Sequence, residues 1–596
     1  SEVVVLCSSI FEMDPLVQSK IEAFSREGSS SHPEEEVNAV SSFLAVCPFT
    51  QIFEFAGQFA PDSDDETHFF NTISRIYLSP NGFQYLSSTE QYFVKALESS
   101  SRKKISEGVA SLLLKMSTLN VGCAEGLLSS AELRNALLSS VARSEISIFQ
   151  YTSKTLISSL KQLLSVNESE NEFANAVKLI CGKAMLEETH MKAKGHSNDT
   201  IILMRYIELL VHISILDDSF FKIAMDGSML DIIVDVIKQN DPLLQMNILD
   251  LTEKLCDSPL HVKYLFKSGI TEWLLYLITG DNAPNWVNNP SPTPDILLAP
   301  QSLRIISMMF ASTYSSTSDA THNEINLNDG EVIPPELILR FLTAACKFGD
   351  DPSNEASNLA AFDAVSNFAG SSPANLGMVL DNKQLAASWL TLPSRTSTKA
   401  FVLHSIAQVI SPRILDKEHS SSRPPVVDAN PSFSGTPHAQ TRITLPPPVP
   451  GQASEQLPND HEESMNKRLF LDFGKYNGYN SGPTTMAFLV ESQRKPISEI
   501  RDAVFDVLRA CAAKEQWGIN FMSACGGFFD FLGNRHTEFN KEGMEWKFSV
   551  IEALVNNANL LIVIKNNEII EKLRLMLTEG PFYVPYTPDG PVTMNS

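Results

Sequence analysis

Two consecutive stretches of this chain decide its fold: NDTIILMRYIELLVHISILDDSFFKIAMDGSMLDIIVDVI from Asn198 to Ile237, and NDPLLQMNILDLTEKLCDSPLHVKYLFKSGITEWLLYLI from Asn240 to Ile278. They align without a gap at a spacing of 42 residues (240 − 198 = 42). In each copy the first apolar residues recur at i, i+4, i+7 and i+11, which is one stripe along an α-helix and excludes a strand. The aligned Gly227 and Gly269 then mark a turn into a second apolar helix.

A period of 42 residues with two or three helices and a loop glycine is typical of armadillo and HEAT repeats. One such repeat has an unburied apolar side, so it is stable only when it stacks on its neighbours. Looser copies begin at Asp351 and at Lys495. The sequence therefore predicts an all-α fold, an armadillo/HEAT-type α-solenoid of ~42-residue repeats.

Composition divides the 596 residues into five predicted parts. Residues 1–35 form an N-terminal segment, residues 36–415 and 469–578 are solenoid repeats, and residues 579–596 are an extended C-terminal tail. Between the two sets of repeats, residues 416–468 contain SSSRPP and LPPPVPG and few aromatics. Such a composition cannot bury enough apolar surface to order itself, so we expect a disordered insertion.

Charge and cysteine usage exclude several classes of partner. The chain has 46 basic and 70 acidic side chains, a net charge of −24, which repels phosphate backbones and anionic lipid surfaces, so we expect no nucleic acid and no membrane partner. Its eight cysteines contain no C-x-x-C pair and indicate buried residues of a reducing compartment. The longest apolar runs fall far below the ~18 residues of a membrane span. We expect a monomer located in the cytoplasm, or also in the nucleus.

No motif for catalysis, cofactor binding or metal binding is present, so we predict a protein that is not an enzyme. Cys525 before Gly526 and Gly527 resembles a nucleophile turn, but it falls where the repeat register places a helix-breaking glycine. His212 and His261 are interpreted as solvated or capped histidines. The acidic runs at 62–66 and 462–463 are interpreted as solvated loops.

The C-terminal end carries a more specific pattern. A glycine-aromatic helix start at 526–531 precedes an R-x-x-E segment from Arg535 to Glu538, and a lysine-containing helix leads to A-L-x-N at 553–556. The chain then continues as LRLMLTEGPFYV at 573–584. In this order the pattern resembles the 26S proteasome non-ATPase regulatory subunit 5 family, and the central repeats look similar to it as well.

This resemblance implies a non-catalytic chaperone for assembly of the base of the proteasome regulatory particle. A member of the family would hold the C-terminal domain of an AAA+ ATPase subunit on a curved helical-repeat surface and leave before the particle is complete. The alternative is a generic armadillo scaffold or adaptor for another complex, because one fold hosts many functions.

A partner surface is predicted on one helix of each central repeat, assigned by similarity to armadillo units. The core stripe there uses Tyr206, Leu209, Ile213, Ile248, Leu251 and Leu255. The side chains that this leaves facing outward are the candidate partner-binding residues: Arg205, Glu208, His212, Asp250, Glu253 and Lys254. A mixed-charge ladder of this kind suits a folded, polar partner, although a solvated helix face has the same pattern.

Overall fold

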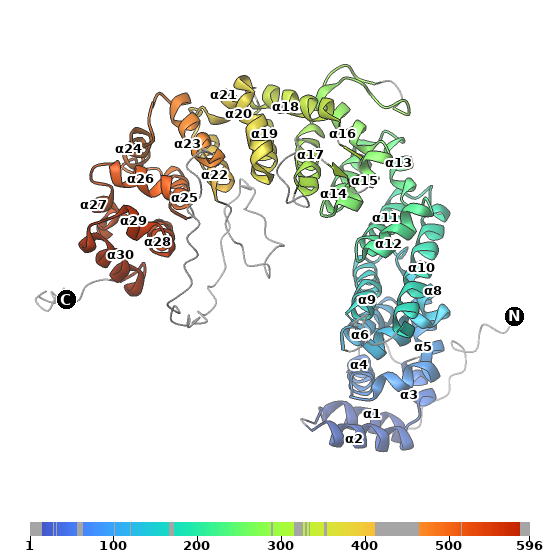
Figure 1. The fold of residues 1–596 in the computed structure, drawn as a ribbon. Helices are drawn as coiled ribbons and strands as arrows, with labels where there is room; N and C mark the ends of the chain where they lie inside the picture. The colour runs from blue at the N-terminus through green and yellow to red at the C-terminus, as the bar shows by residue number, and fades with distance from the viewer. Residues whose placement is uncertain are drawn as a thin grey trace, which may run out of the picture. The chain divides into compact units, whose positions relative to one another are not determined.

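The computed structural model describes residues 15–583 except 28, 31, 57–63, 100–101, 120, 166–171, 288–289, 315–325, 328–330, 333, 351–353, 412–463 and 514. The chain divides into two compact units. The first comprises Ser1–Trp273 with Asn282–Pro290, and the second comprises Leu274–Asp281 with Ser291–Ser596. Each unit is built of helices that pack in two layers (Figure 1).

The described residues of the first unit form α1 (Pro15–Arg26), α2 (Pro33–Val46), α3 (Phe49–Ala56), α4 (Asp64–Tyr77), the 3-10 helix η1 (Gly82–Tyr85), α5 (Leu86–Glu98), α6 (Lys103–Leu119), α7 (Val121–Ser129), α8 (Ala131–Ser140), α9 (Ile146–Leu164), α10 (Glu172–Gly195), α11 (Thr200–Ser214), α12 (Asp218–Asp226), α13 (Asp231–Ile237), α14 (Pro242–Lys254) and α15 (Pro259–Lys267). Helix α16 (Ile270–Thr279) begins in this unit and ends in the second.

The second unit continues with α17 (Ala299–Tyr314), the strands β1 (Asn326–Leu327) and β2 (Glu331–Val332), α18 (Pro335–Gly349), α19 (Glu355–Ser371), α20 (Pro373–Asp381), α21 (Lys383–Leu390), α22 (Thr396–Ile410), α23 (Met465–Tyr476), α24 (Gly482–Ser492), α25 (Ser498–Ala513), α26 (Gln516–Ala524), α27 (Phe528–Leu532), η3 (Arg535–Thr537), α28 (Lys541–Asn556), α29 (Leu560–Val563) and α30 (Asn567–Glu579). The two strands pair antiparallel over two residues each and are the strands of the described chain.

The two central copies fold as the sequence predicts. Helices α11 and α14 begin at Thr200 and Pro242, 42 residues apart (242 − 200 = 42), and each is followed by two shorter helices. Asp199 and Asp241 cap them, accepting hydrogen bonds from backbone N–H groups of the first turn. All six residues of the predicted core stripe are buried. The all-α repeat fold is thus confirmed.

The loop glycines differ between the two copies. Gly269 adopts φ +79°, the left-handed conformation that lets a chain leave a helix. In the first copy, Gly227 ends α12 with a negative φ, and Ser228 after it is the left-handed residue, with φ +51°. The turn has therefore moved by one residue between copies that align without a gap.

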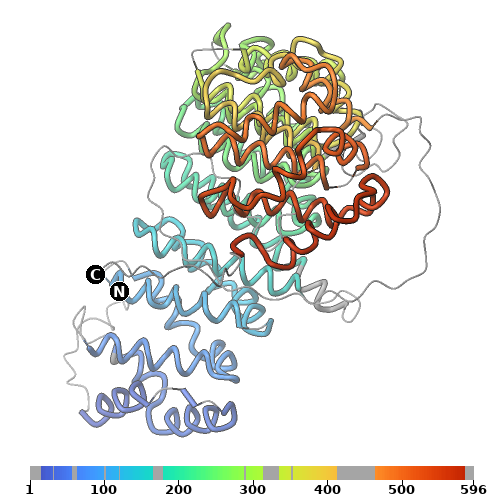
Figure 2. The backbone as a smooth tube through the Cα atoms, turned by 90° about the vertical axis from the view of Figure 1, so that its left-hand side faces the viewer, coloured from blue at the N-terminus to red at the C-terminus, as the bar shows by residue number. Residues whose placement is uncertain are grey.

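One row of helices runs through each unit. In the first unit α4, α6, α9, α11 and α14 pack each against the next, and α5, α8, α10, α12 and α15 form the other layer. In Figure 1, α4, α6 and α9 lie on one side of this unit and α5, α8 and α10 on the other. In the second unit the row is α17, α19, α22, α25, α28 and α30. Figure 2 shows the helices of the first unit, coloured blue to teal, as layers of the tube, one above another.

Arginine side chains join successive repeats of the first unit. Arg75, Arg102, Arg143 and Arg205 each donate to backbone carbonyls at or just after the C-terminal end of α1, α3, α5 and α8, respectively. The last carbonyls of a helix lack intrahelical hydrogen-bond donors and lie at the negative end of the helix dipole. A guanidinium supplies both the donors and a favourable positive charge. The same contact therefore recurs at four helix ends of the first unit.

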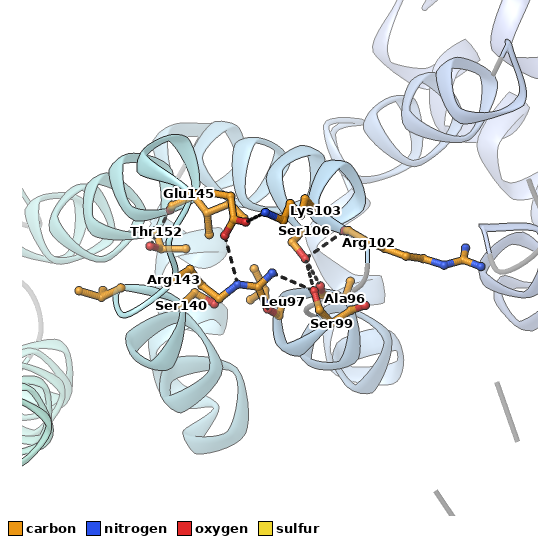
Figure 3. A network of polar contacts seen from close by, with 12 residues as sticks. Ala96, Leu97, Ser99, Arg102, Lys103, Ser106, Ser140, Arg143, Glu145 and Thr152 are labelled. Atoms are coloured by element: carbon orange, nitrogen blue, oxygen red, sulfur yellow. Dashed lines mark hydrogen bonds and ion pairs between the residues drawn. The ribbon is translucent and has the colours of Figure 1, made fainter. Parts of the chain in front are cut away.

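The network around Glu145 shows how one such contact is extended (Figure 3). Arg143 donates to the carbonyls of Leu97 at 3.1 Å and Ser99 at 2.9 Å, and its Nε lies 3.6 Å from the carboxylate of Glu145. Lys103, the first residue of α6, contacts the same carboxylate at 2.6 Å. This hydrogen bond from Lys103 lowers the pKa of Glu145 to about 2, so the carboxylate stays charged at the N-terminal end of α9.

Two details of the sequence interpretation need correction. Asp64, Asp65 and Glu66 are not a loop, since they form the first turn of α4, where carboxylates are favoured by the helix dipole. The predicted disordered insertion at 416–468 extends too far, because α23 begins at Met465. Residues 416–463 of that insertion, with its acidic pair at 462–463, lie outside the described residues, as does the predicted tail beyond residue 583.

Candidate partner-binding surfaces

Arg205, the first predicted partner-binding residue, has a different environment from the one expected. Its guanidinium donates to the carbonyls of Arg143 at 2.5 Å and Val141 at 3.4 Å, and lies 4.8 Å from the centre of the Phe149 ring. The side chain thus spans the junction with the preceding repeat. Sequence spacing placed it correctly off the core stripe, but could not show that the end of α8 lies within its reach.

His212 and Lys254, two further members of the set, are brought together. They occupy the same position of consecutive copies (254 − 212 = 42), and Lys254 Nζ lies 2.9 Å from His212 Nε2. Both side chains are half-buried. Burial, with the positive charges of Lys254 and Lys161 in support, lowers the pKa of His212 to about 4. The imidazole is therefore neutral at pH 7, and its Nε2 accepts a hydrogen bond from the ammonium of Lys254.

The three acidic members remain the accessible part of the predicted surface. Asp250 is exposed, and Glu208 and Glu253 are half-buried. Glu208 lies on α11, whereas Asp250 and Glu253 lie on α14, which packs against it. In place of the predicted mixed-charge ladder, the structure has an acidic surface beside a hydrogen-bonded pair, His212 and Lys254, in which the histidine is neutral.

The C-terminal motif residues lie together although they are far apart in sequence. Arg535 pairs with Glu579 at 2.7 Å, donates to the Gly580 carbonyl at 2.9 Å, and lies 5.3 Å from the centre of the Tyr583 ring. Lys541 lies 5.6 Å from the Phe582 ring. The R-x-x-E segment and the E-G-P-F-Y segment are therefore two halves of one contact, which joins the end of α30 to η3 and to the start of α28.

A buried ionic network lies under this contact. Lys547 is 4% exposed and donates to the carbonyls of Phe531 at 2.9 Å and Asn534 at 2.6 Å and to the Thr537 hydroxyl at 2.6 Å. Glu538, 3% exposed, pairs with Arg501 of α25. Burial lowers the pKa of Lys547 to about 8 and raises that of Glu538. All three protons of the ammonium are satisfied, so Lys547 stays charged at pH 7.

The sequence contained a signal for this network that its interpretation missed. The buried residues of α28 recur as Gly543, Lys547, Val550 and Leu554, at i, i+4, i+7 and i+11. A lysine in the middle of a core stripe is rare unless its charge is satisfied. The pattern therefore predicts that other elements supply acceptors to Lys547, although it does not identify them.

The catalytic alternatives have no support in local geometry. Cys525 follows α26, and Gly527 before α27 has φ +77°, so the glycine turn separates two helices as expected. Burial raises the pKa of the Cys525 thiol, which disfavours the thiolate. The seven described cysteines are free and buried, as predicted. His261 is not solvated, since it is 5% exposed and packs 4.1 Å from the Phe221 ring.

Two features are absent from the described residues, a metal-binding cluster and a membrane-spanning helix. Within the ranges described above, no group of three or more His, Cys, Asp or Glu is arranged to hold a metal ion. Of the helices that the structure describes, none has the length and apolar character needed to cross a membrane.

Taken together, the helix rows and their junctions define an all-α helical-repeat protein. Comparison with known sequences adds a local similarity: residues 464–593 match the model of the proteasome non-ATPase 26S subunit family. The 26S proteasome non-ATPase regulatory subunit 5 of Homo sapiens is 29% identical over 123 residues, and that of Bos taurus is 29% identical over 90 residues. The resemblance to the 26S proteasome non-ATPase regulatory subunit 5 family is therefore confirmed.

These matches are partial. The matched stretches cover 21% and 15% of this chain, and 24% and 18% of the human and bovine relatives. Among solved structures, yeast importin-β is similar with a TM-score of 0.47 at 12% identity, covering 95% of this chain and 62% of that one. An engineered protein has a TM-score of 0.34 at 12% identity, covering 85% of this chain and 98% of that one.

Proposed function

We propose that this protein is a non-catalytic chaperone for assembly of the proteasome regulatory particle base. In this proposal it binds the C-terminal domain of an AAA+ ATPase subunit of the base through a helical-repeat surface. It acts as a monomer until it binds, in the cytoplasm or also in the nucleus.

One observation carries the proposal: the family match at 464–593 includes the two segments that the structure joins. Arg535 begins η3, before α28, and Glu579 ends α30, 44 residues later (579 − 535 = 44), yet they form an ion pair at 2.7 Å. Residues that resemble the family and also contact one another support a shared fold for this region better than separate sequence matches would. The named relatives are non-ATPase subunits of the 26S proteasome, which supports binding without catalysis.

The test is a binding assay with purified components. The full chain is immobilised, and each ATPase subunit of the base is passed over it separately, followed by its isolated C-terminal domain. We expect one subunit to be retained at micromolar concentration or below, and its C-terminal domain to account for most of the affinity. Retention of none of the subunits would contradict the proposal. A denatured sample of each subunit serves as the control for adhesion to exposed apolar surface.

A generic scaffold or adaptor is the second candidate. It is favoured by the position of the most regular repeats, α11 to α16, which lie outside the residues that match the family model. A repeat surface takes unrelated partners in different proteins. Recovery of another complex from cell extract, together with no binding of any purified base subunit, would support this candidate over the first.

A further inference from the structure

A cavity in the second unit has an apolar floor and a cationic rim. It measures about 200 Å³ and lies among α22, α24 and α25 and the loops that follow α21, α23 and α24. Its floor is formed by Leu403, Leu489, Ile500 and Val504, all at most 5% exposed. The cavity therefore offers room for an apolar group that would otherwise remain in water.

The polar side chains of this cavity differ in what they still offer a ligand. Asn477 is occupied, because its amide donates to the Leu390 and Phe473 carbonyls, at 2.9 and 2.8 Å, and accepts from the Leu392 N–H at 3.0 Å. The Ser492 hydroxyl donates to the Phe488 carbonyl. The fixed amide and hydroxyl thus shape the wall rather than select a ligand.

The two lysines of the lining are different. Lys399 of α22 is half-buried, and Lys495 lies exposed between α24 and α25. In the part of the chain that the structure describes, neither ammonium group has a hydrogen-bond or ion-pair partner. Two cations at one apolar cavity in a chain of net charge −24 define a local site for negative charge.

We infer that this cavity binds a short peptide segment of a protein partner in which an aspartate or glutamate stands beside an aliphatic side chain. The aliphatic group would fill the floor, and the carboxylate would accept hydrogen bonds from Lys399 and Lys495. A nucleic acid or an anionic lipid surface is disfavoured, because the net charge of the chain repels an extended polyanion.

This inference is independent of the proposed function, since it names the chemistry of the bound segment and not the partner. It concerns a different place from the acidic surface on α11 and α14. A lysine-rimmed cavity could be only a solvated gap between repeats, so the test must separate carboxylate recognition from general adhesion.

The test uses the full chain and synthetic peptides. A fluorescein-labelled peptide with a central Leu-Asp-Leu, flanked by Gly and Ser, is compared with the same peptide carrying Leu-Asn-Leu. Fluorescence anisotropy should give a Kd of roughly 0.1–1 mM for the first and at least ~10-fold weaker binding for the second. Equal affinities would overturn the inference, and so would absence of binding of both.

The variant Lys399→Gln/Lys495→Gln should weaken binding of the aspartate peptide at least ~10-fold. Lys565→Gln is the matched control, because Lys565 is an exposed lysine of the same unit outside the cavity, and it should leave the affinity unchanged. Reductive methylation read by mass spectrometry is an independent measurement in the unaltered chain. The peptide should protect Lys399 and Lys495 but not Lys565, and uniform protection would overturn the assignment of the site.

Discussion

The repeats of the first unit, from α1 to α11, and the C-terminal region from α25 to α30 are held together by different kinds of contact. In the first region, helix ends meet arginine side chains of the next repeat, and the same device recurs at four junctions. In the second, Lys547 and Glu538 lie inside the core as part of one network with Arg501. The first region is held by many separate contacts at helix ends, and the second by one buried network.

The two regions differ in how strongly a single substitution should destabilise them. A capping arginine keeps part of its hydration, so its loss costs a few hydrogen bonds to carbonyls that water can partly replace. Water cannot replace a buried ammonium in this way, so removing the ammonium leaves buried hydrogen-bond acceptors without a donor. We therefore expect substitutions in the C-terminal network to have larger effects than substitutions at the repeat junctions.

The largest effect is expected for Lys547→Met. Methionine fits the apolar part of the site but leaves the Phe531 and Asn534 carbonyls without their donor, and removes positive charge near Glu538. We expect a loss of ~3–5 kcal/mol in the free energy of unfolding of the second unit. Urea denaturation measures this loss, with hydrogen exchange of α25 to α30 to show that it arises there.

Lys565→Met is the control for this substitution, because Lys565 is exposed in the loop before α30. It should change the free energy of unfolding by less than ~0.5 kcal/mol. A loss below about 1 kcal/mol for Lys547→Met would remove the proposed contrast between the two regions.

The sequence predicted the regular region more completely than the C-terminal one. The predicted spacing of 42 residues recurs between the helix starts at Thr200 and Pro242, and the predicted stripe from Tyr206 to Leu255 is buried. In the second unit the row starts at Glu355 and Thr396 are 41 apart (396 − 355 = 41), and those at Ser498 and Lys541 are 43 apart (541 − 498 = 43). Apolar periodicity therefore predicts the repeat fold, even where the sequences of the copies match only weakly.

Apolar periodicity could not predict the polar contacts between repeats. Periodicity placed Arg205 and His212 off the core stripe, but it contains no information on which carbonyl or side chain of a neighbouring helix lies opposite. Arg205 reaches carbonyls more than 60 residues earlier, whereas His212 meets Lys254 one repeat later. The candidate surface could be predicted only as a set of outward positions, and the three-dimensional packing divides that set into structural and accessible members.

Arg205→Gln tests the junction type of contact. The substitution removes the charged donor from the Val141 and Arg143 carbonyls and from the face of the Phe149 ring. We expect a loss of ~1.5–3 kcal/mol in the stability of the first unit, because hydrogen bonds from a charged donor are the stronger kind. Thermal unfolding is the measurement, and Arg26→Gln is the control, since Arg26 is 68% exposed in an i,i+4 pair. Equal, small effects of both would show that Arg205 is a surface side chain after all.

The charge reversal Glu208→Lys/Asp250→Lys/Glu253→Lys asks whether the accessible members of the predicted surface contact the partner. We expect binding of the ATPase subunit to weaken by ~1–3 kcal/mol if these carboxylates lie near the centre of the interface, with little change in Tm. Calorimetric titration of the purified subunit measures the affinity.

The matched control for that triple variant reverses three acidic residues of the same unit on other helices, Glu132, Glu187 and Asp226, all exposed. Its net charge is identical, so a loss of affinity shared by both triple variants reports long-range electrostatics rather than contact. Unchanged binding of the variant with the substitutions on α11 and α14 would place the partner on other repeats.

The smallest effect is expected for His212→Gln, and it depends on pH. The folded pKa of His212, about 4, lies below the ~6.5 of an unfolded histidine, so the unfolded chain takes up a proton first as the pH falls. The contribution to stability is fully present above pH ~6.5 and is lost as the pH falls towards 4. Glutamine still accepts a hydrogen bond from Lys254 but does not titrate. Urea denaturation between pH 4 and 7 should therefore show the unsubstituted chain losing about 1 kcal/mol more than the variant, the half-buried ring retaining part of its hydration. Parallel pH profiles of the two proteins would mean that the ring is solvated, as the sequence alone had suggested, and that the pair with Lys254 adds nothing to the junction between the two most regular repeats.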